Sequence, residues 1–90
     1  MPIKLNLYPW LSAVAGGRKA VEVKGETIGE CLGCVHDMFP GIKERLMNQE
    51  GGVRPYISIL LNGVNTYPEE LLMPVKNGDE ISFIYLIDGG

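Results

Sequence analysis

The sequence has few of the residues from which proteins build catalytic or metal sites. It contains one histidine, His36, and two cysteines, Cys31 and Cys34. A zinc site needs about four ligands, and no second cysteine pair completes the set, so a structural metal is not expected. With no serine-histidine-aspartate set and no converging carboxylates, the chain is not expected to be an enzyme. We interpret the cysteines as structural thiols of a helix and His36 as a solvated surface residue.

Long apolar runs and clusters of basic residues are also missing. The chain starts Met1-Pro2-Ile3-Lys4 without an apolar leader, and no run approaches the length that spans a membrane. The net charge is −3 and the 8 Lys and Arg residues are scattered, whereas a nucleic-acid-binding protein needs a basic stripe. We therefore expect a cytoplasmic protein that binds neither nucleic acid nor membrane. We also expect it to be a monomer when free.

The hydrophobic pattern orders the elements of a single domain, which is all that 90 residues allow. Apolar and polar residues alternate over 3–8, which predicts a half-buried strand. Further strands are predicted at 20–24, 56–61, 64–67 and 81–87. A helix is expected to start at Thr27, because Thr27-Ile28-Gly29-Glu30 forms a capping box. Its apolar stripe runs until Pro40 ends the helix, and residues 42–46 can add a turn.

Glycines mark turns and also interrupt the predicted helix. Asn62-Gly63 is a strong signal for a tight hairpin turn. Gly29 and Gly33 lie inside the helix, where each costs about 1 kcal/mol relative to alanine. Close packing and simple tolerance are both consistent with these two positions.

The chain ends on two glycines directly after an apolar strand. Asp88, Gly89 and Gly90 follow residues 81–87, and glycine adds no packing to a strand. An arm without side chains that carries an α-carboxylate can thread into a narrow active-site channel of another protein. The alternative is a frayed end without a role, because the termini of domains are often loose. The residues of the tail leave both interpretations open.

Four motifs follow one another along the chain. They are Phe39-Pro40-Gly41, Leu61-Asn62-Gly63, the segment from Pro74 to Phe83, and the final Gly89-Gly90. In this order they resemble the small ubiquitin-like sulfur carriers of the ThiS/MoaD type, which include the small subunit of molybdopterin synthase. The resemblance implies an α+β fold of the β-grasp type, a mixed sheet of four to five strands with one main helix packed on one face. Residues 1–87 would form the domain and 88–90 a flexible tail.

The resemblance also implies a chemistry for the tail. An adenylating activating enzyme uses ATP and Mg²⁺ to convert the Gly90 carboxylate into an acyl-adenylate. Sulfur from a cysteine desulfurase or another donor then displaces AMP and leaves a thiocarboxylate, which donates sulfur at an acceptor enzyme such as the large subunit of molybdopterin synthase. The chain would bind no cofactor itself and would supply only Asp88, Gly89 and Gly90 to the partners' channels.

The acceptor is less closely indicated than the carrier role. Members of the molybdopterin branch commonly have a proline and small residues where this chain has Tyr85-Leu86-Ile87-Asp88. Chain length and the long helix-to-strand connection favour molybdenum- or tungsten-cofactor synthesis first and thiamine thiazole synthesis next, with amino-acid biosynthesis and transfer-RNA thiolation open. Two other classes remain: a ubiquitin-like modifier conjugated to lysines through Gly90, and a β-grasp interaction domain without tail chemistry.

A docking surface is expected beside the tail. In β-grasp order the last strand lies between the first and the third. This order gathers Tyr8, Leu60, Ile84 and Leu86 on the sheet face away from the helix, where a contiguous apolar group fits a partner interface. The alternative is that the Trp10 loop or the crossover from Pro68 to Pro74 covers Ile84 and Leu86.

Overall fold

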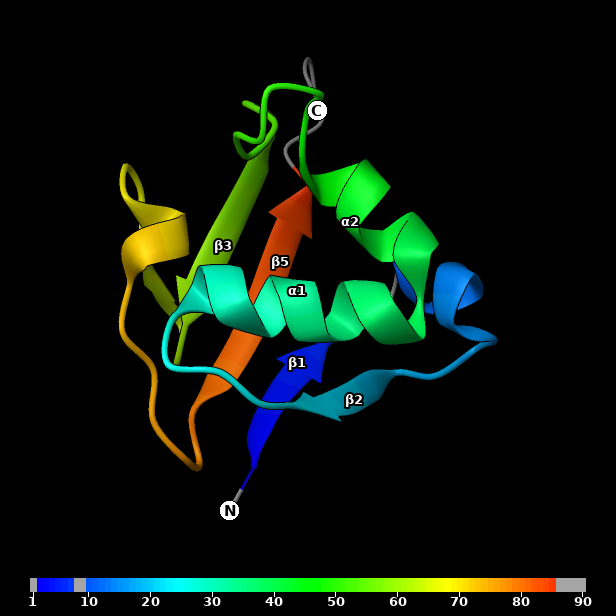
Figure 1. The fold of residues 1–90 in the computed structure, drawn as a ribbon, viewed down its shortest axis with the longest axis horizontal. Helices are drawn as coiled ribbons and strands as arrows, with labels where there is room; N and C mark the ends of the chain where they lie inside the picture. Colours follow the sequence, from blue (N-terminus) through cyan, green and yellow to red (C-terminus); the bar gives the residue numbers. More distant parts are fainter. Residues whose placement is uncertain (1, 8–9, 86–90) are drawn as a thin grey trace.

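The computed structural model describes residues 2–7 and 10–85, in which five strands form one mixed sheet (Figure 1). The strands are β1 (Ile3–Asn6), β2 (Ala20–Val23), β3 (Ile57–Leu61), β4 (Val64–Asn65) and β5 (Glu80–Tyr85). Their order is β2-β1-β5-β3-β4, with β1 and β5 parallel and all other neighbours antiparallel. The expected position of the last strand between the first and the third is confirmed.

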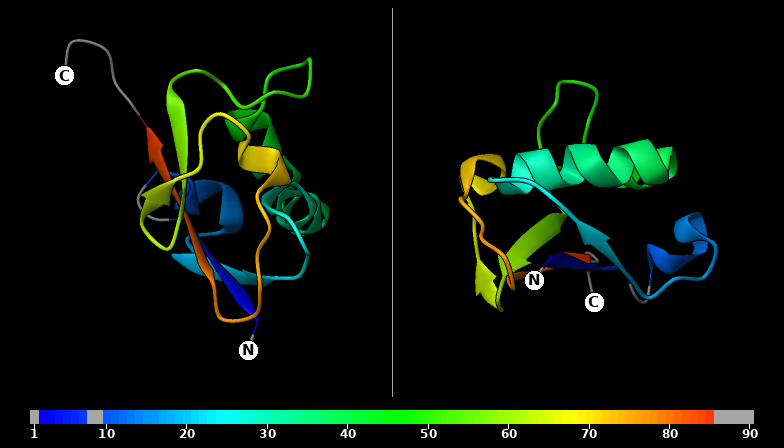
Figure 2. Two further views of the ribbon diagram at one scale, coloured as in Figure 1. Left: turned by 90° about the vertical axis from the view of Figure 1, so that its left-hand side faces the viewer. Right: turned by 60° about the horizontal axis from the view of Figure 1, so that its bottom comes forward.

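The two α-helices lie on the same side of the sheet (Figure 2). Helix α1 (Ile28–Met38) crosses the sheet face, and α2 (Pro40–Leu46) follows it after one residue. Two short 3₁₀ helices, η1 (Ser12–Ala15) and η2 (Glu70–Leu72), lie in the connections. The α+β β-grasp class is confirmed, and the turn expected at 42–46 is part of a second helix of seven residues.

A core between α1 and the sheet holds β5 in place. The strands bury every second residue, namely Ile3, Leu5, Val21, Val23, Ile57, Ile59, Ile81 and Phe83. Helix α1 buries Ile28, Leu32 and Val35 against them. Burial of one such aliphatic side chain stabilises the fold by about 1.5–3 kcal/mol, so the central strand is strongly anchored on its helix side.

The capping box and the proline set the ends of α1. Thr27 Oγ1 accepts from the backbone N–H of Glu30 at 3.1 Å, and Glu30 Oε1 accepts from the N–H of Glu26 at 2.9 Å. The box is therefore confirmed, with its second bond one residue before the cap. Pro40 ends α1 as expected and also begins α2, because its fixed φ and missing N–H suit the first position of a helix.

The two glycines of α1 have different surroundings. A Cβ at Gly29 would lie 2.9 Å from the carbonyl oxygen of Leu71 in η2, so the lack of a side chain lets α1 pack closely there. At Gly33 no described atom lies within 4 Å of the same position. Close packing thus accounts for Gly29, whereas Gly33 is merely tolerated.

Several strand boundaries differ from the expected ones by one or two residues. The strand expected at 64–67 ends at Asn65, because the backbone N–H and the hydroxyl of Thr66 both donate to the carbonyl of Ile59, at 3.1 and 2.8 Å. β3 begins at Ile57 and β5 already at Glu80. The hairpin turn is confirmed, since Asn62 and Gly63 both have positive φ. Residue 8 of the first expected strand lies outside the described residues.

Candidate functional site

Strand β5 leads to the C-terminal tail from the middle of the sheet. Tyr85 is its last residue, and β1 and β3 lie on its two sides. The predicted reactive residues Asp88, Gly89 and Gly90 lie outside the described residues, so their role stays a prediction. What the structure describes is the surface from which these residues follow.

The sheet face away from α1 carries part of the predicted docking surface. Ile84 pairs with Ser58 and is 43% exposed, so neither the Trp10 loop nor the 68–74 crossover covers it. Leu60 pairs with Ser82, two residues along β3 from Ser58 and therefore on the same face, and it is half-buried. The structure thus brings Leu60 and Ile84 together on one face, while Tyr8 and Leu86 lie outside the described residues.

The helix side of the same sheet end carries an aromatic cluster that we did not predict. The ring of Tyr85 lies 5.1 Å from the ring of Trp10 in an edge-to-face arrangement and 5.1 Å from the ring of Tyr56. Strand alternation puts Tyr85 on the side of Ile81 and Phe83, which was the one signal for this position. The meeting with Trp10 and Tyr56 depends on tertiary structure and has no local signal.

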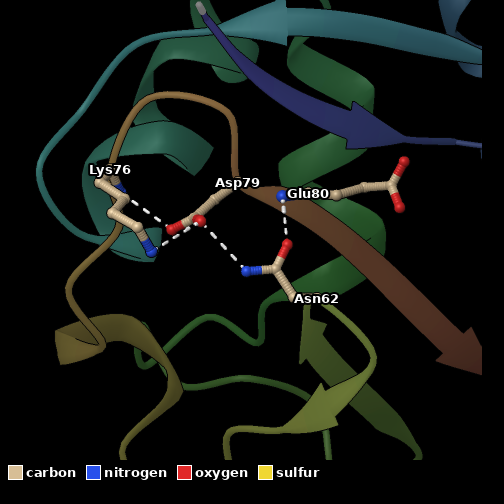
Figure 3. A network of polar contacts seen from close by, with 4 residues as sticks. All are labelled: Asn62, Lys76, Asp79 and Glu80. Carbon is tan, nitrogen blue, oxygen red and sulfur yellow. Dashed lines mark hydrogen bonds and ion pairs between the residues drawn. The ribbon is translucent and has the colours of Figure 1, made fainter.

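A polar network fixes the opposite end of β5 (Figure 3). Asp79 is 5% exposed and accepts from the Asn62 side chain at 3.0 Å, from the Lys76 backbone N–H at 2.9 Å and from Lys76 Nζ at 3.2 Å. The side-chain oxygen Oδ1 of Asn62 in turn accepts from the backbone N–H of Glu80 at 2.9 Å. The network joins the β3–β4 turn to the turn before β5.

These contacts also stabilise the ionised form of Asp79. The hydrogen bond from the Asn62 amide, followed by that from the Lys76 backbone, lowers the pKa of the Asp79 carboxyl below its ordinary value of 3.8. Two of the motifs behind the family resemblance, Leu61-Asn62-Gly63 and the segment from Pro74 to Phe83, therefore form a structural joint. This joint lies at the other end of β5 from the tail.

The cysteines and the histidine form no chemical centre. Cys31 is fully buried, and this burial raises the pKa of its thiol to about 11, which keeps it neutral and unreactive near neutral pH. Cys34 is a half-buried free thiol. His36 is half-buried rather than solvated as expected, and its Nδ1 is covered and has no hydrogen-bond partner among the described residues. No cluster of three or more His, Cys, Asp or Glu within 2–7 and 10–85 could hold a metal.

A hollow with a volume of about 1050 Å³ lies along the edge strand β2. Charges of both signs line it, and the nearest pair, Lys4 and Glu80, forms an exposed salt bridge of 3.5 Å. Its lining includes no residue of the sheet end that leads to the tail. We therefore place the candidate site at the end of β5.

None of the described helices is long and apolar enough to cross a membrane.

Curated relatives match the whole chain. A protein of Archaeoglobus fulgidus assigned as a sulfur carrier is 28% identical over 91 residues, and the match covers all of both chains. The sulfur carrier protein CysO of Mycobacterium tuberculosis is 25% identical over 93 residues, again with both chains fully covered. No family model matches the chain.

Solved structures show the same fold over nearly the whole length. CysO in the BexX/CysO complex of Amycolatopsis orientalis superposes with a TM-score of 0.88 at 29% identity, covering 98% of this chain and 99% of that one. SAMP1 of Haloferax volcanii superposes with a TM-score of 0.78 at 27% identity, with both chains fully covered.

The fold and these relatives define a ubiquitin-like β-grasp protein. These full-length relatives and structural neighbours support the resemblance to the ubiquitin-like sulfur carriers of the ThiS/MoaD type that the motifs predicted.

Proposed function

We propose that this chain carries sulfur as a thiocarboxylate on Gly90 and acts as a substrate of its partner enzymes. The observation that supports this most is the full-length match to proteins named as sulfur carriers, together with a sequence that ends on Gly89-Gly90. The described body adds a consistent feature, because its only fully buried thiol, Cys31, is held neutral and its histidine has no catalytic partner.

The proposed chemistry takes place at the terminal carboxylate. In the activating enzyme the Gly90 carboxylate attacks the α-phosphate of Mg·ATP, which forms the acyl-adenylate and releases pyrophosphate. The terminal sulfur of a persulfide on a cysteine desulfurase or another donor then attacks the acyl carbonyl and displaces AMP. A second thiol cleaves the resulting acyl disulfide, which leaves the thiocarboxylate on Gly90 and a disulfide between that thiol and the donor sulfur. Gly89 and Gly90 present no side chain, so the carboxylate can reach the end of a narrow channel in this enzyme and later in the acceptor.

The acceptor enzyme stays a prediction. Molybdenum- or tungsten-cofactor synthesis is our first choice and thiamine thiazole synthesis the next. The likeness to CysO in a complex with BexX supports delivery of the tail to a partner protein, without naming the partner of this chain. Incubating the loaded chain with each candidate acceptor, and following loss of the sulfur by intact mass, identifies the pathway.

Intact-mass analysis tests the proposal directly. The chain is co-expressed with its activating enzyme and a sulfur donor, and a parallel sample lacks the enzyme. We expect the exchange of one oxygen atom for one sulfur atom, confined to the C-terminal peptide, only when the enzyme is present. A chain that keeps its encoded mass, while the same enzyme preparation loads another carrier, contradicts the proposal.

A second candidate function is conjugation to lysines. The likeness to SAMP1, a small archaeal modifier protein, favours it specifically. Both functions begin with the same adenylate, so the discriminating observation is a ladder of higher-mass lysine conjugates in cells, which a pure sulfur carrier lacks. A plain interaction domain, the third class, would keep its function with one residue appended after Gly90.

A further inference from the structure

A hollow opens on the helix side of the sheet end from which the tail follows. Its volume is about 340 Å³, and it is lined by Trp10, Glu44, Arg45, Arg54, Tyr56 and Tyr85. The three aromatic rings form its apolar wall, with Tyr56 37% and Tyr85 45% exposed. The arginines come from the last turn of α2 and from the segment that follows it.

One of the two arginines is held in a fixed orientation. Arg54 Nε and Nη2 donate to the carbonyl of Glu44 at 3.3 and 3.0 Å, and the Arg54 backbone N–H donates to the carbonyl of Leu46 at 2.9 Å. Arg54 thereby caps the free carbonyls at the end of α2. A guanidinium has five N–H donors, so three of them have no partner among the described residues.

The hollow is positively charged in a protein that is acidic as a whole. The side chain of Arg45 is exposed and forms no ion pair or hydrogen bond within the described part of the chain. Glu44 is the one acidic residue in the lining, and its carboxylate is not within ion-pair distance of either arginine. Two arginines against one glutamate contrast with the net charge of −3 of the chain.

We propose that this hollow docks an acidic segment of the activating enzyme, with a carboxylate on Arg45 and the free N–H groups of Arg54 and an apolar side chain against Trp10, Tyr56 and Tyr85. This inference rests on the proposed carrier function. Arginine binds carboxylates through paired hydrogen bonds, and aromatic residues with arginine are the usual anchors of protein interfaces.

The position of the hollow favours an enzyme that receives the tail as the occupant. The five residues after Tyr85 span at most roughly 18 Å when fully extended. An enzyme that receives the Gly90 carboxylate must therefore come close to the end of β5. The hollow lies at that end and carries the charge that an acidic surface of the enzyme complements.

The test compares two charge reversals on the same helix turn. Arg45→Glu reverses a charge in the hollow, whereas Lys43→Glu makes the same change in the last turn of α2 outside the hollow. Both variants place a glutamate near the same helix end, so they share any effect of the helix dipole. Arg54 is left unchanged, because its replacement would uncap α2.

The measured quantities are KM and kcat for this chain in adenylation by its activating enzyme. We expect Arg45→Glu to raise KM about tenfold with kcat within about twofold of wild type, because a repelled carboxylate weakens docking but leaves the tail intact. Lys43→Glu should keep KM within about twofold. Arg45→Gln and Tyr56→Ala should raise KM by smaller factors. They replace Arg45→Glu in the test if that charge reversal unfolds the chain.

The outcomes separate this inference from the proposed function. If Arg45→Gln and Tyr56→Ala are still adenylated and both have the KM of wild type, the docking site is overturned. The carrier function is then unaffected. Equal rises in KM for Arg45→Glu and Lys43→Glu also overturn it, since the effect would then be general charge. If the wild-type chain is never adenylated, the proposed function itself fails.

Discussion

At its start, β5 is fixed by buried side chains that hydrogen-bond to one another, whereas at its end its side chains are largely exposed. Asp79 is almost fully buried and bonds to Asn62 and Lys76, while Ile84 and Tyr85 are 43% and 45% exposed. The contrast teaches where substitutions should act. Changes at the start of the strand should alter the stability of the fold, and changes at its end should alter recognition by partners.

The largest expected effect on the fold comes from breaking the joint at the start of β5. Asp79→Ala leaves the Asn62 amide and the Lys76 N–H without their acceptor, and we expect the melting temperature to fall by roughly 10–15 °C. Below the transition, sulfur loading per folded molecule should stay at the wild-type level. Calorimetry and intact mass measure the two quantities, and reduced loading of fully folded protein would break the comparison.

The lowered pKa of the Asp79 carboxyl predicts how the stability of the fold depends on pH. Its folded pKa lies below the ordinary value of 3.8, so its contribution to stability is complete well above that pH. The contribution is lost as the pH falls through 3.8 towards the lower folded pKa. Urea unfolding at about pH 7 and pH 3 should therefore show a smaller loss of stability for Asp79→Asn than for wild type. An equal loss in both would argue against the lowered pKa.

The two glycines of α1 give a matched pair within the stable body. Gly29→Ala should lower the free energy of unfolding by about 1–3 kcal/mol, because its Cβ meets the carbonyl of Leu71. Gly33→Ala should raise it by up to about 1 kcal/mol, because the site is open and alanine favours helix. Denaturant titration of both variants checks the signs. Neither change should alter adenylation.

At the other end of β5, an acidic residue on the outer face should weaken recognition alone. Ile84→Asp should keep the fold and raise KM for the activating enzyme about tenfold, equivalent to about 1.4 kcal/mol. Leu60→Asp, on the neighbouring strand, should act in the same direction. Normal binding by Ile84→Asp, or its unfolding, would show that this face is not the interface.

Replacing the two cysteines should have a modest effect on stability and none on sulfur loading. Changing Cys31 and Cys34 to alanine should lower the free energy of unfolding by about 1–2 kcal/mol, since mainly the small buried Cys31 loses packing. Sulfur loading should be unchanged, because the thiocarboxylate needs no internal thiol. If the double variant folds but cannot be loaded with sulfur, the cysteines take part in the sulfur chemistry and our structural interpretation of them is wrong.

Short sequence motifs predicted much of the fold but less of the surface at the end of β5. The capping box at Thr27 and the Asn62-Gly63 turn were predictable, because each depends on residues a few positions apart. The cluster of Trp10, Tyr56 and Tyr85 was not, because its members come together only through strand order and packing. The half-burial of His36 was missed for a similar reason, because it depends on tertiary packing.

Deletion of Gly90, with unfolding and adenylation measured on the same preparation, tests most directly whether the body and the tail have separate roles. The account predicts a free energy of unfolding within about 0.5 kcal/mol of wild type, as expected for a change away from the core, and no acyl-adenylate with the activating enzyme and Mg·ATP. A shortened chain that still forms the adenylate at the wild-type rate would contradict the carrier function.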